Sequence, residues 1–434
     1  MRRHSRFSAL YDEVSLPENY RRSLRLMLCS CACGNMFGVI KGGAAFTGYT
    51  EFLGTNDFLY GLMMATPYLA ALTQLPMALF MSHTGKRKKW LLLFGGISRL
   101  LWIPIAIVPL LFPGVGSMTH IWIVLLLNAI SSMCSSAVNV GFTPWMGEFV
   151  SLPIRGRWLA CRHQIESVIS VGFGLLIARL LNMLPSPVSY YTVLLIGAIL
   201  GCMDICFYIG VTEIPIRDHP TSLFSSLREI LRNRPFLQFC LFWGCLEFSK
   251  ALASAYYIRY AGTDLGLNDG QCVLCFQIAG CVIGLLCISR WGKSVDAYGN
   301  YHVLAMTQSL LAATPLLWLL AALHSIWIPL IYNILAAILN CCQTMMSTSL
   351  LLEKAPHEKN VIYIAVYSCG IQLLGAFPGA LCGGALLSFF RAMPFSYPDA
   401  YQLLFLTSAL LQGAVLALFL PGMKPAVQQK TITG

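Results

Sequence analysis

Twelve long apolar runs divide this chain of 434 residues, and they constrain its fold more than any other feature. A backbone amide inside a bilayer finds no water, so an apolar run of about 20 residues satisfies its polar groups by forming a helix. The alternating pattern of a membrane β-barrel is absent. We therefore expect an all-α polytopic membrane protein with twelve transmembrane helices. The runs cover approximately residues 26–47, 57–82, 90–112, 120–147, 163–184, 188–211, 236–258, 270–290, 302–322, 325–350, 361–388 and 399–420.

The composition excludes the soluble and disordered classes. Charged residues make up 11% of the chain, against about 25% in an ordinary soluble domain. The mean hydropathy of +0.68 is too high for a disordered chain. The net charge of +11 raises the question of nucleic acid, but no basic stretch is interleaved with aromatic residues, and we expect no nucleic-acid partner.

The 17 cysteines lie mostly within the apolar runs. Thiols there pack as small apolar groups, and no Cys/His set has zinc-like spacing. We therefore expect no metal, no disulfide and no cofactor. Residues 1–25 are polar and lead into the first run without a small-residue cleavage site, so we also expect no removable signal peptide.

The basic residues predict the orientation of the chain in its membrane. With the N-terminus inside, 23 of the 29 lysines and arginines fall on the cytoplasmic side. The external loops hold mainly acidic residues, with Arg259 and Arg391 at their edges. Cytoplasmic loops of membrane proteins are enriched in lysine and arginine. We expect a multi-pass protein of the cell membrane, such as a bacterial inner membrane, with both termini in the cytoplasm.

The longest internal loop divides the runs six and six, and the two halves look related. The loop containing Gly85 aligns with the loop containing Gly299 at an offset of 214 residues. Residues 153–157 align with residues 356–360 at an offset of 203. This spacing indicates a parallel duplication. We expect an N-terminal bundle over residues 1–211, a cytoplasmic loop over 212–235 with a surface helix at 223–234, and a C-terminal bundle over 236–434.

These loops resemble the signature Gly-x-x-x-Asp-x-x-Gly-x-(Arg/Lys)-(Arg/Lys) of the major facilitator superfamily. The first copy keeps Gly85, Lys86 and Arg87, but Ala78 and Ser82 replace its earlier Gly and Asp. The second copy keeps the Gly, Asp and Gly at positions 292, 296 and 299 but lacks the basic pair. The stretch from Pro144 to Arg162 is similar to a poorly characterised prokaryotic branch of this superfamily.

The resemblance implies that these loops act as gates on the cytoplasmic side. In the family the Asp faces the positive end of a neighbouring helix and the basic pair faces anionic lipid. Asp296 would then hold the inner gate more firmly than Ser82. The alternative is that residues 86–89 only set the topology. The expected gating residues are Gly85, Lys86, Arg87, Arg155, Arg157, Gly292, Asp296 and Gly299.

The same resemblance implies a solute site near the midplane between the halves, mainly on spans one, four, seven and ten. Spans four and ten each carry a polar stripe at helical spacing, and the stripes are related by an offset of 205 residues. We expect them to line an aqueous cavity; the alternative is that they only join helices through hydrogen bonds. The stripes contain Asn128, Ser132, Ser135 and Asn139 on span four and Asn333, Asn340 and Thr344 on span ten.

Three charges within the spans are further cavity candidates, because each costs about 2.5 to 3.5 kcal/mol at a helix centre. Glu247 and Lys250 are three residues apart on span seven, and Lys41 lies on span one. Two lysines and one glutamate favour an anionic solute. Glu247 is also a candidate for proton coupling. The alternative is that these residues form a structural ion pair.

Other charges within the spans are assigned structural roles. The candidate partners of Arg99 are the Glu148 end of span four and Asn or Ser groups on span four, and we expect a structural network. Arg179, Glu166 and Asp204 lie near span ends and are expected at the membrane interface, where arginine can snorkel.

The sequence thus predicts a secondary transporter that moves a small solute by alternating access. Because the chain lacks a Gly-x-x-x-x-Gly-Lys-(Ser/Thr) phosphate loop, coupling would use a proton or sodium gradient. An anionic or zwitterionic solute is favoured; a sugar carrier or a drug exporter is the alternative. A lipid translocase, a receptor or a membrane-embedded enzyme are alternatives of other classes. We expect a monomer in the lipid bilayer, with no enzymatic activity.

Overall fold

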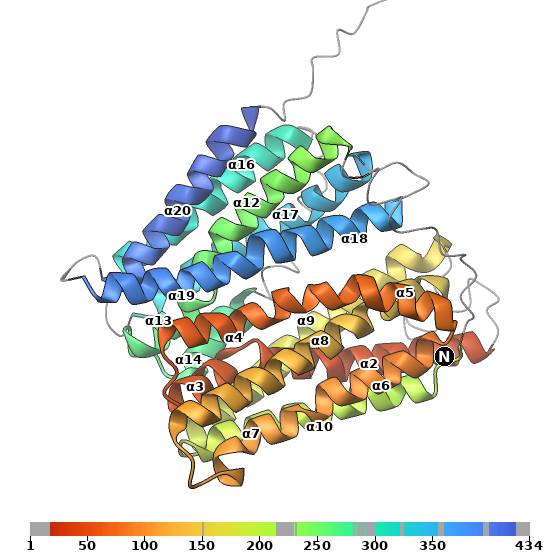
Figure 1. The fold of residues 1–434 in the computed structure, drawn as a ribbon, viewed down its shortest axis with the longest axis horizontal. Helices are drawn as coiled ribbons and strands as arrows, with labels where there is room; N and C mark the ends of the chain where they lie inside the picture. The colour runs from red at the N-terminus through yellow and green to blue at the C-terminus, as the bar shows by residue number, and fades with distance from the viewer. Residues whose placement is uncertain are drawn as a thin grey trace, which may run out of the picture.

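The structure is a computed structural model, and it describes residues 18–149, 152–213, 230, 232–280, 283, 291, 300–321, 325–354, 360–393 and 399–421. Every regular element in these ranges is helical. Figure 1 shows the helices in two groups that lie one above the other.

The first group holds the helices of the N-terminal half, drawn in red to yellow-green (Figure 1). Its helices follow the apolar runs, with short 3-10 or irregular joints where prolines and glycines interrupt them. They are α2 (Glu18–Lys41), α3 (Ala44–Phe52), α4 (Asp57–Leu69), η1 (Ala70–Thr73), α5 (Gln74–Thr84), α6 (Arg87–Leu100), α7 (Trp102–Leu111), α8 (Ser117–Phe149), α9 (Leu152–Met183) and α10 (Val188–Ile209).

The second group holds the helices of the C-terminal half, drawn in green to blue (Figure 1). Within it, α13 and α14 lie where the two groups meet. The helices are α12 (Arg234–Ser254), α13 (Tyr256–Thr263), α14 (Asp269–Val273), η2 (Leu274–Ile278), α16 (Asn300–Ala313), η3 (Thr314–Leu320), α17 (Trp327–Lys354), α18 (Asn360–Gly370), η5 (Ile371–Ala376), α19 (Phe377–Arg391) and α20 (Ala400–Phe419).

The all-helical fold is confirmed, and each of the twelve predicted runs coincides with helical structure in the described residues. Nine helical segments among those residues are long and apolar enough to cross a membrane. The predicted surface helix at 223–234 lies mostly outside the described residues.

Close packing of α12 against α19 holds the second group together. Gly375, Gly379 and Gly383 are spaced one turn apart on η5 and α19. A Cβ atom on them would lie 2.5, 2.4 and 2.2 Å, respectively, from backbone oxygens of α12. Only glycine permits two helix backbones to approach so closely.

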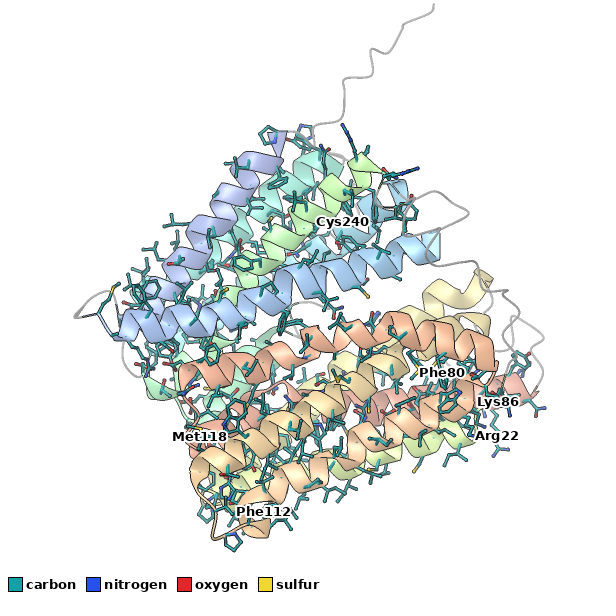
Figure 2. The ribbon with its side chains drawn as sticks, viewed as in Figure 1. Arg22, Phe80, Lys86, Phe112, Met118 and Cys240 are labelled. Atoms are coloured by element: carbon teal, nitrogen blue, oxygen red, sulfur yellow. The ribbon has the colours of Figure 1, made fainter. Side chains whose placement is uncertain are left out.

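The two ends of the molecule differ in chemistry. Arg22 and Lys86 lie at one end of the first group, which we name the basic end (Figure 2). Phe112 and Met118 lie at the opposite end (Figure 2). The chain enters α4 at this second end, which we name the latch end for the contacts described next.

Candidate functional site

An ion cluster joins the two halves at the latch end. Asp57, in the first turn of α4, places its carboxylate 2.9 Å from Arg391 Nε of α19 and 3.6 Å from Arg259 Nη2 of α13. Glu51 of α3 lies 3.6 Å from Arg259 Nε. The Asp57 side chain is only 7% exposed. A buried carboxylate between two guanidinium groups of the opposite half is costly to separate from them.

Hydrogen bonds to backbone oxygens extend this contact. Arg259 Nη2 donates to Thr55 O at 2.6 Å, and Tyr256 Oη donates to Asp57 O at 3.0 Å. In the other direction, Tyr60 Oη donates to Ala255 O at 2.9 Å. The Arg259 guanidinium also lies 4.7 Å from the centre of the Tyr60 ring. The latch end is thus closed by bonds that run both ways between the halves.

A second contact repeats the same start of a helix 212 residues later. Asn56 caps α4 before Asp57, and Asn268 caps α14 before Asp269. Asp269 accepts a hydrogen bond from Tyr190 Oη of α10 at 2.9 Å. Burial raises the pKa of the Asp269 carboxyl. Each half therefore contributes one Asn-Asp helix start to the closed end, one held by arginines and the other by a tyrosine.

A cavity of about 630 Å³ lies within the first group, and the second group closes one of its sides. Helices α2, α6, α8, α9 and α10 supply most of its wall. Phe276 and Gln277 reach it from η2, a π-helical turn of the second group. Such turns often mark functional sites. Gln277 Nε2 also donates to Val39 O at 2.7 Å, which ties the second group to α2 beside the cavity.

An ion pair within this cavity corrects the roles predicted for Arg99 and Asp204. Arg99 Nη2 donates to Asp204 Oδ2 at 3.1 Å, and Ser30 Oγ donates to Asp204 Oδ1 at 2.5 Å. The Arg99 guanidinium lies 4.3 Å from the centre of the Phe37 ring. Its partner is therefore Asp204 on α10, not a polar group on span four. Asp204 is buried, not interfacial.

A second ion pair faces the same cavity. Arg162 Nε donates to Glu166 Oε1 at 2.9 Å, and His163 Nδ1 lies 2.9 Å from Glu166 Oε2. Cys31 Sγ donates to Glu166 Oε1 at 2.9 Å. With Arg99 and Asp204, these groups place two guanidinium groups and two carboxylates in the cavity wall. Glu166 thus lines a cavity, which corrects its predicted place at the membrane interface.

Lys41 lies beside this network without a carboxylate. Its Nζ donates to Ser132 Oγ at 3.4 Å and lies 5.9 Å from the centre of the Trp102 ring. The positive charge of Arg99 acts on Lys41. In the described part of the chain, Lys41 has no ion pair. Among the described charges at and beside this cavity, Arg99 and Arg162 each pair with a carboxylate, and Lys41 does not.

The predicted pair on span seven lies in a separate cavity of about 250 Å³. Glu247 Oε1 accepts from Lys250 Nζ at 2.8 Å and from Gln343 Nε2 at 2.9 Å. Tyr257 and Tyr332 stand in its wall and belong to an aromatic cluster around Trp318. Tyr68 of α4 reaches this cavity from the first group. Lys41 and Lys250 therefore do not share a cavity.

The predicted polar stripes divide among several environments. Asn128 is buried and donates to Thr66 Oγ1 at 2.8 Å, while Ser132 holds Lys41. Asn139 lines the large cavity, and Asn340 lines the small one. Asn333 donates to Pro329 O at 2.9 Å. Ser135 lies half-buried on α8, and Thr344 belongs to α17, its side chain outside the described residues.

The predicted gating loops are described only in part. Gly85 ends α5 with φ of +63°, a left-handed conformation that suits glycine. Lys86 precedes α6, and Arg87 is buried in its first turn. Arg155 and Arg157 lie on α9, their side chains outside the described set. Gly292, Asp296 and Gly299 lie outside the described residues altogether.

Sequence reasoning missed the latch and the paired charges of the large cavity. The repeated Asn-Asp at 56–57 and 268–269 was a usable signal for the latch, because asparagine followed by aspartate favours the start of a helix. The pairing of Arg99 with Asp204 left no such signal, since it joins residues 105 positions apart.

Comparison with known proteins gives the family. The family model of the Major Facilitator Superfamily matches residues 26–377. No curated protein sequence matches the chain. A variant of the nucleoside transporter NupG has a similar structure, with a TM-score of 0.72 and 12% identity over 93% of this chain and 100% of that one.

Two bacterial structures add to this likeness in fold. A bacterial homolog of the human lysosomal transporter Spinster, inward-facing and occupied, gives a TM-score of 0.68 at 12% identity, over 93% of this chain and 97% of that one. A bacterial homologue of the iron transporter ferroportin, also inward-facing, gives 0.65 at 13% identity, over 94% and 99%. The chain has a transporter fold and is a multi-pass membrane protein, and it belongs to the Major Facilitator Superfamily.

Proposed function

We propose that this protein is a secondary transporter that moves a small polar solute by alternating access. The observation that carries the proposal is the large cavity with its two ion pairs, set beside a latch that seals one end of the molecule. Charged side chains inside an apolar bundle cost stability. A cavity that they line within a membrane protein is therefore a candidate solute site. Alternation requires that such a seal can form and break.

The direction of the seal follows from charge. Arg22 and Lys86 lie at the basic end, and basic loops favour the cytoplasm. We therefore place the latch end outside, the termini inside, and the structure in an inward-facing state. On this view residues 1–211 and 236–434 form two six-helix bundles joined by residues 212–235, and they rock about the cavity.

The basic-end loops would form the opposite seal in the outward-facing state. Gly85 allows the turn between α5 and α6, and Lys88 Nζ already donates to Ile209 O at 2.7 Å and Val211 O at 2.8 Å. We propose that Lys86, Arg87 and the second loop at Asp296 contribute contacts there, with Arg155 and Arg157 at the start of α9.

The solute is proposed to carry an anionic group, as an acid or a zwitterion. Lys41 is a half-buried cation whose described partner is a hydroxyl, and the charge of the Arg99 guanidinium acts on it. A carboxylate or phosphate would offset the positive charge that the described carboxylates leave unbalanced.

A neutral ring-shaped solute is the second candidate. Tyr68, Tyr257 and Tyr332 line the small cavity, and aromatic faces stack on sugar and base rings. The similar structure of NupG belongs to a nucleoside transporter. On this alternative, Asn340 and the Glu247–Lys250 pair would bind the polar groups of the ring.

Uptake by purified protein in proteoliposomes tests the proposal. We expect one of five labelled probes, namely lactate, benzoate, alanine, glucose and uridine, to accumulate above protein-free vesicles and to exchange against unlabelled solute inside. Lactate or benzoate uptake supports the anionic class, and uridine or glucose uptake supports the ring-shaped class. Lipid flipping or product formation without movement of any probe would contradict the proposal.

A further inference from the structure

We propose that Asp204 takes up one proton when a small monocarboxylate binds Arg99 in the large cavity, so that the proton and the solute cross the membrane together. The inference rests on the proposed transport function. It assigns the solute class, the coupling ion and the coupling residue, and it replaces Glu247 in that role.

The Arg99–Asp204 pair is open to competition for its cation. Arg99 uses one donor, Nη2, on Asp204, and its Nε is buried without a hydrogen-bond partner in the described structure. The Arg99 side chain is 14% exposed and lines the cavity. Asp204 thus engages a single Arg99 donor, and the part of the guanidinium that is exposed to the cavity can donate to an anion that enters.

A bound carboxylate changes the charge that Asp204 experiences. Two carboxylates on one guanidinium repel each other, and this repulsion is strong where water is scarce. A proton on Asp204 removes the repulsion and leaves the solute as the anion paired with Arg99. The step forms one O–H bond at an Asp204 carboxyl oxygen and breaks one O–H bond of a hydronium ion from the aqueous phase that the cavity meets, which becomes water. When the solute leaves, Arg99 pairs with Asp204 again and the proton is released.

The other groups around Asp204 do not take over this role. From α2, Ser30 Oγ donates to Asp204, and Cys33 lies farther away on the same helix. From α9, the charge of Arg162 acts on Asp204 at longer range. Arg162 itself already donates hydrogen bonds to Glu166 and Cys31. On α10 itself, Tyr208 is the remaining titratable neighbour. From α6, Arg99 is the direct partner. Lys41 adds positive charge near Arg99 and so strengthens the attraction of an anion.

Glu247 and Glu166 are poorer candidates on the same geometry. Glu247 accepts from Lys250 and Gln343 of its own half, in the separate small cavity. Glu166 accepts from Arg162 and Cys31, and His163 lies against its other oxygen. In neither case does the cationic partner have a buried donor left without a partner, as Arg99 does.

Calorimetry of the purified full chain tests the inference without transport. Benzoate is titrated into the protein at one pH in two buffers with different heats of ionisation, with glycerol as the neutral comparison. The difference in heat gives the number of protons taken up on binding. For the unaltered protein we expect an uptake of about one proton per benzoate. For Asp204→Asn we expect benzoate binding with loss of the proton uptake, and for Glu247→Gln we expect the uptake to persist.

An Asp204→Asn variant that still takes up a proton would overturn the inference, as would unaltered protein that binds benzoate and takes up none. If Asp204→Asn does not fold, Ser30→Ala serves instead. It removes a hydrogen bond to the charged carboxylate and should shift the pH midpoint of proton uptake upward; an unchanged midpoint contradicts the inference. Uptake of uridine or glucose without benzoate binding would also contradict the inference, but it would still support the proposed transport function.

Discussion

At the scale of single residues, the two intramembrane lysines show which contacts sequence spacing can predict and which it cannot. The sequence identified Lys41 and Lys250 correctly as charges within spans, because a charge inside an apolar run is easy to see. The partners of the two lysines were harder to predict from the sequence. Lys250 pairs with Glu247 three residues away, which spacing predicts. Lys41 instead donates to Ser132, which lies 91 positions later on another helix. The charge balance that favours an anion depends on that tertiary contact.

Lys41→Met should separate function from stability. The variant removes a half-buried charge that has no described carboxylate partner, so we expect its melting temperature to be equal to or higher than that of the parent. We expect the affinity for benzoate to fall at least tenfold, since roughly 1.4 kcal/mol of interaction corresponds to that factor. Thermal unfolding in detergent and calorimetry measure the two quantities.

Lys250→Met is the matched control because its lysine has a partner. Removing it leaves Glu247 with Gln343 alone, and breaking a partly exposed pair of this kind should cost about 1 to 3 kcal/mol of unfolding free energy. A Lys41→Met variant that is destabilised as much as Lys250→Met, with benzoate affinity unchanged, would refute the assignment of Lys41.

At the scale of elements, helix positions were predictable and their interruptions were not. Each apolar run coincides with helical structure where its residues are described, because a backbone buried in lipid requires internal hydrogen bonding. The π-helical turns η2 and η5 depend on how neighbouring helices pack. The glycines at 375, 379 and 383 allow η5 and α19 to approach α12 closely.

Gly379→Val tests the packing of α19 on α12. Its Cβ would lie 2.4 Å from Phe248 O, so the helices must separate. We expect a loss of about 3 kcal/mol or more in stability, seen as a lower melting temperature and reduced yield of folded protein. Gly413→Ala is the control, because a Cβ there meets no atom within 4 Å. Equal stability of both variants would show that the close approach is not required.

At the scale of the whole molecule, alternating access requires that the two ends close in turn. The family signature lies at the basic end, and part of that signature falls outside the described residues. The structure instead resolves the latch end, where Asp57, Arg259 and Arg391 come from three helices and two halves. No local pattern predicts such a meeting, because it is formed only by the closure of one half on the other.

Hydrogen exchange after Asp57→Asn tests this reciprocity most directly. The substitution removes the charge that holds Arg391 at 2.9 Å. We predict faster amide exchange at the latch end, in α4 and α13, together with slower exchange at the basic end, in α5 and α18. The matched variant Asp399→Asn alters a latch-end carboxylate that caps α20 within its own half, and it should leave the basic end unchanged. Faster exchange at the latch end with no slowing at the basic end would contradict alternating access through this latch.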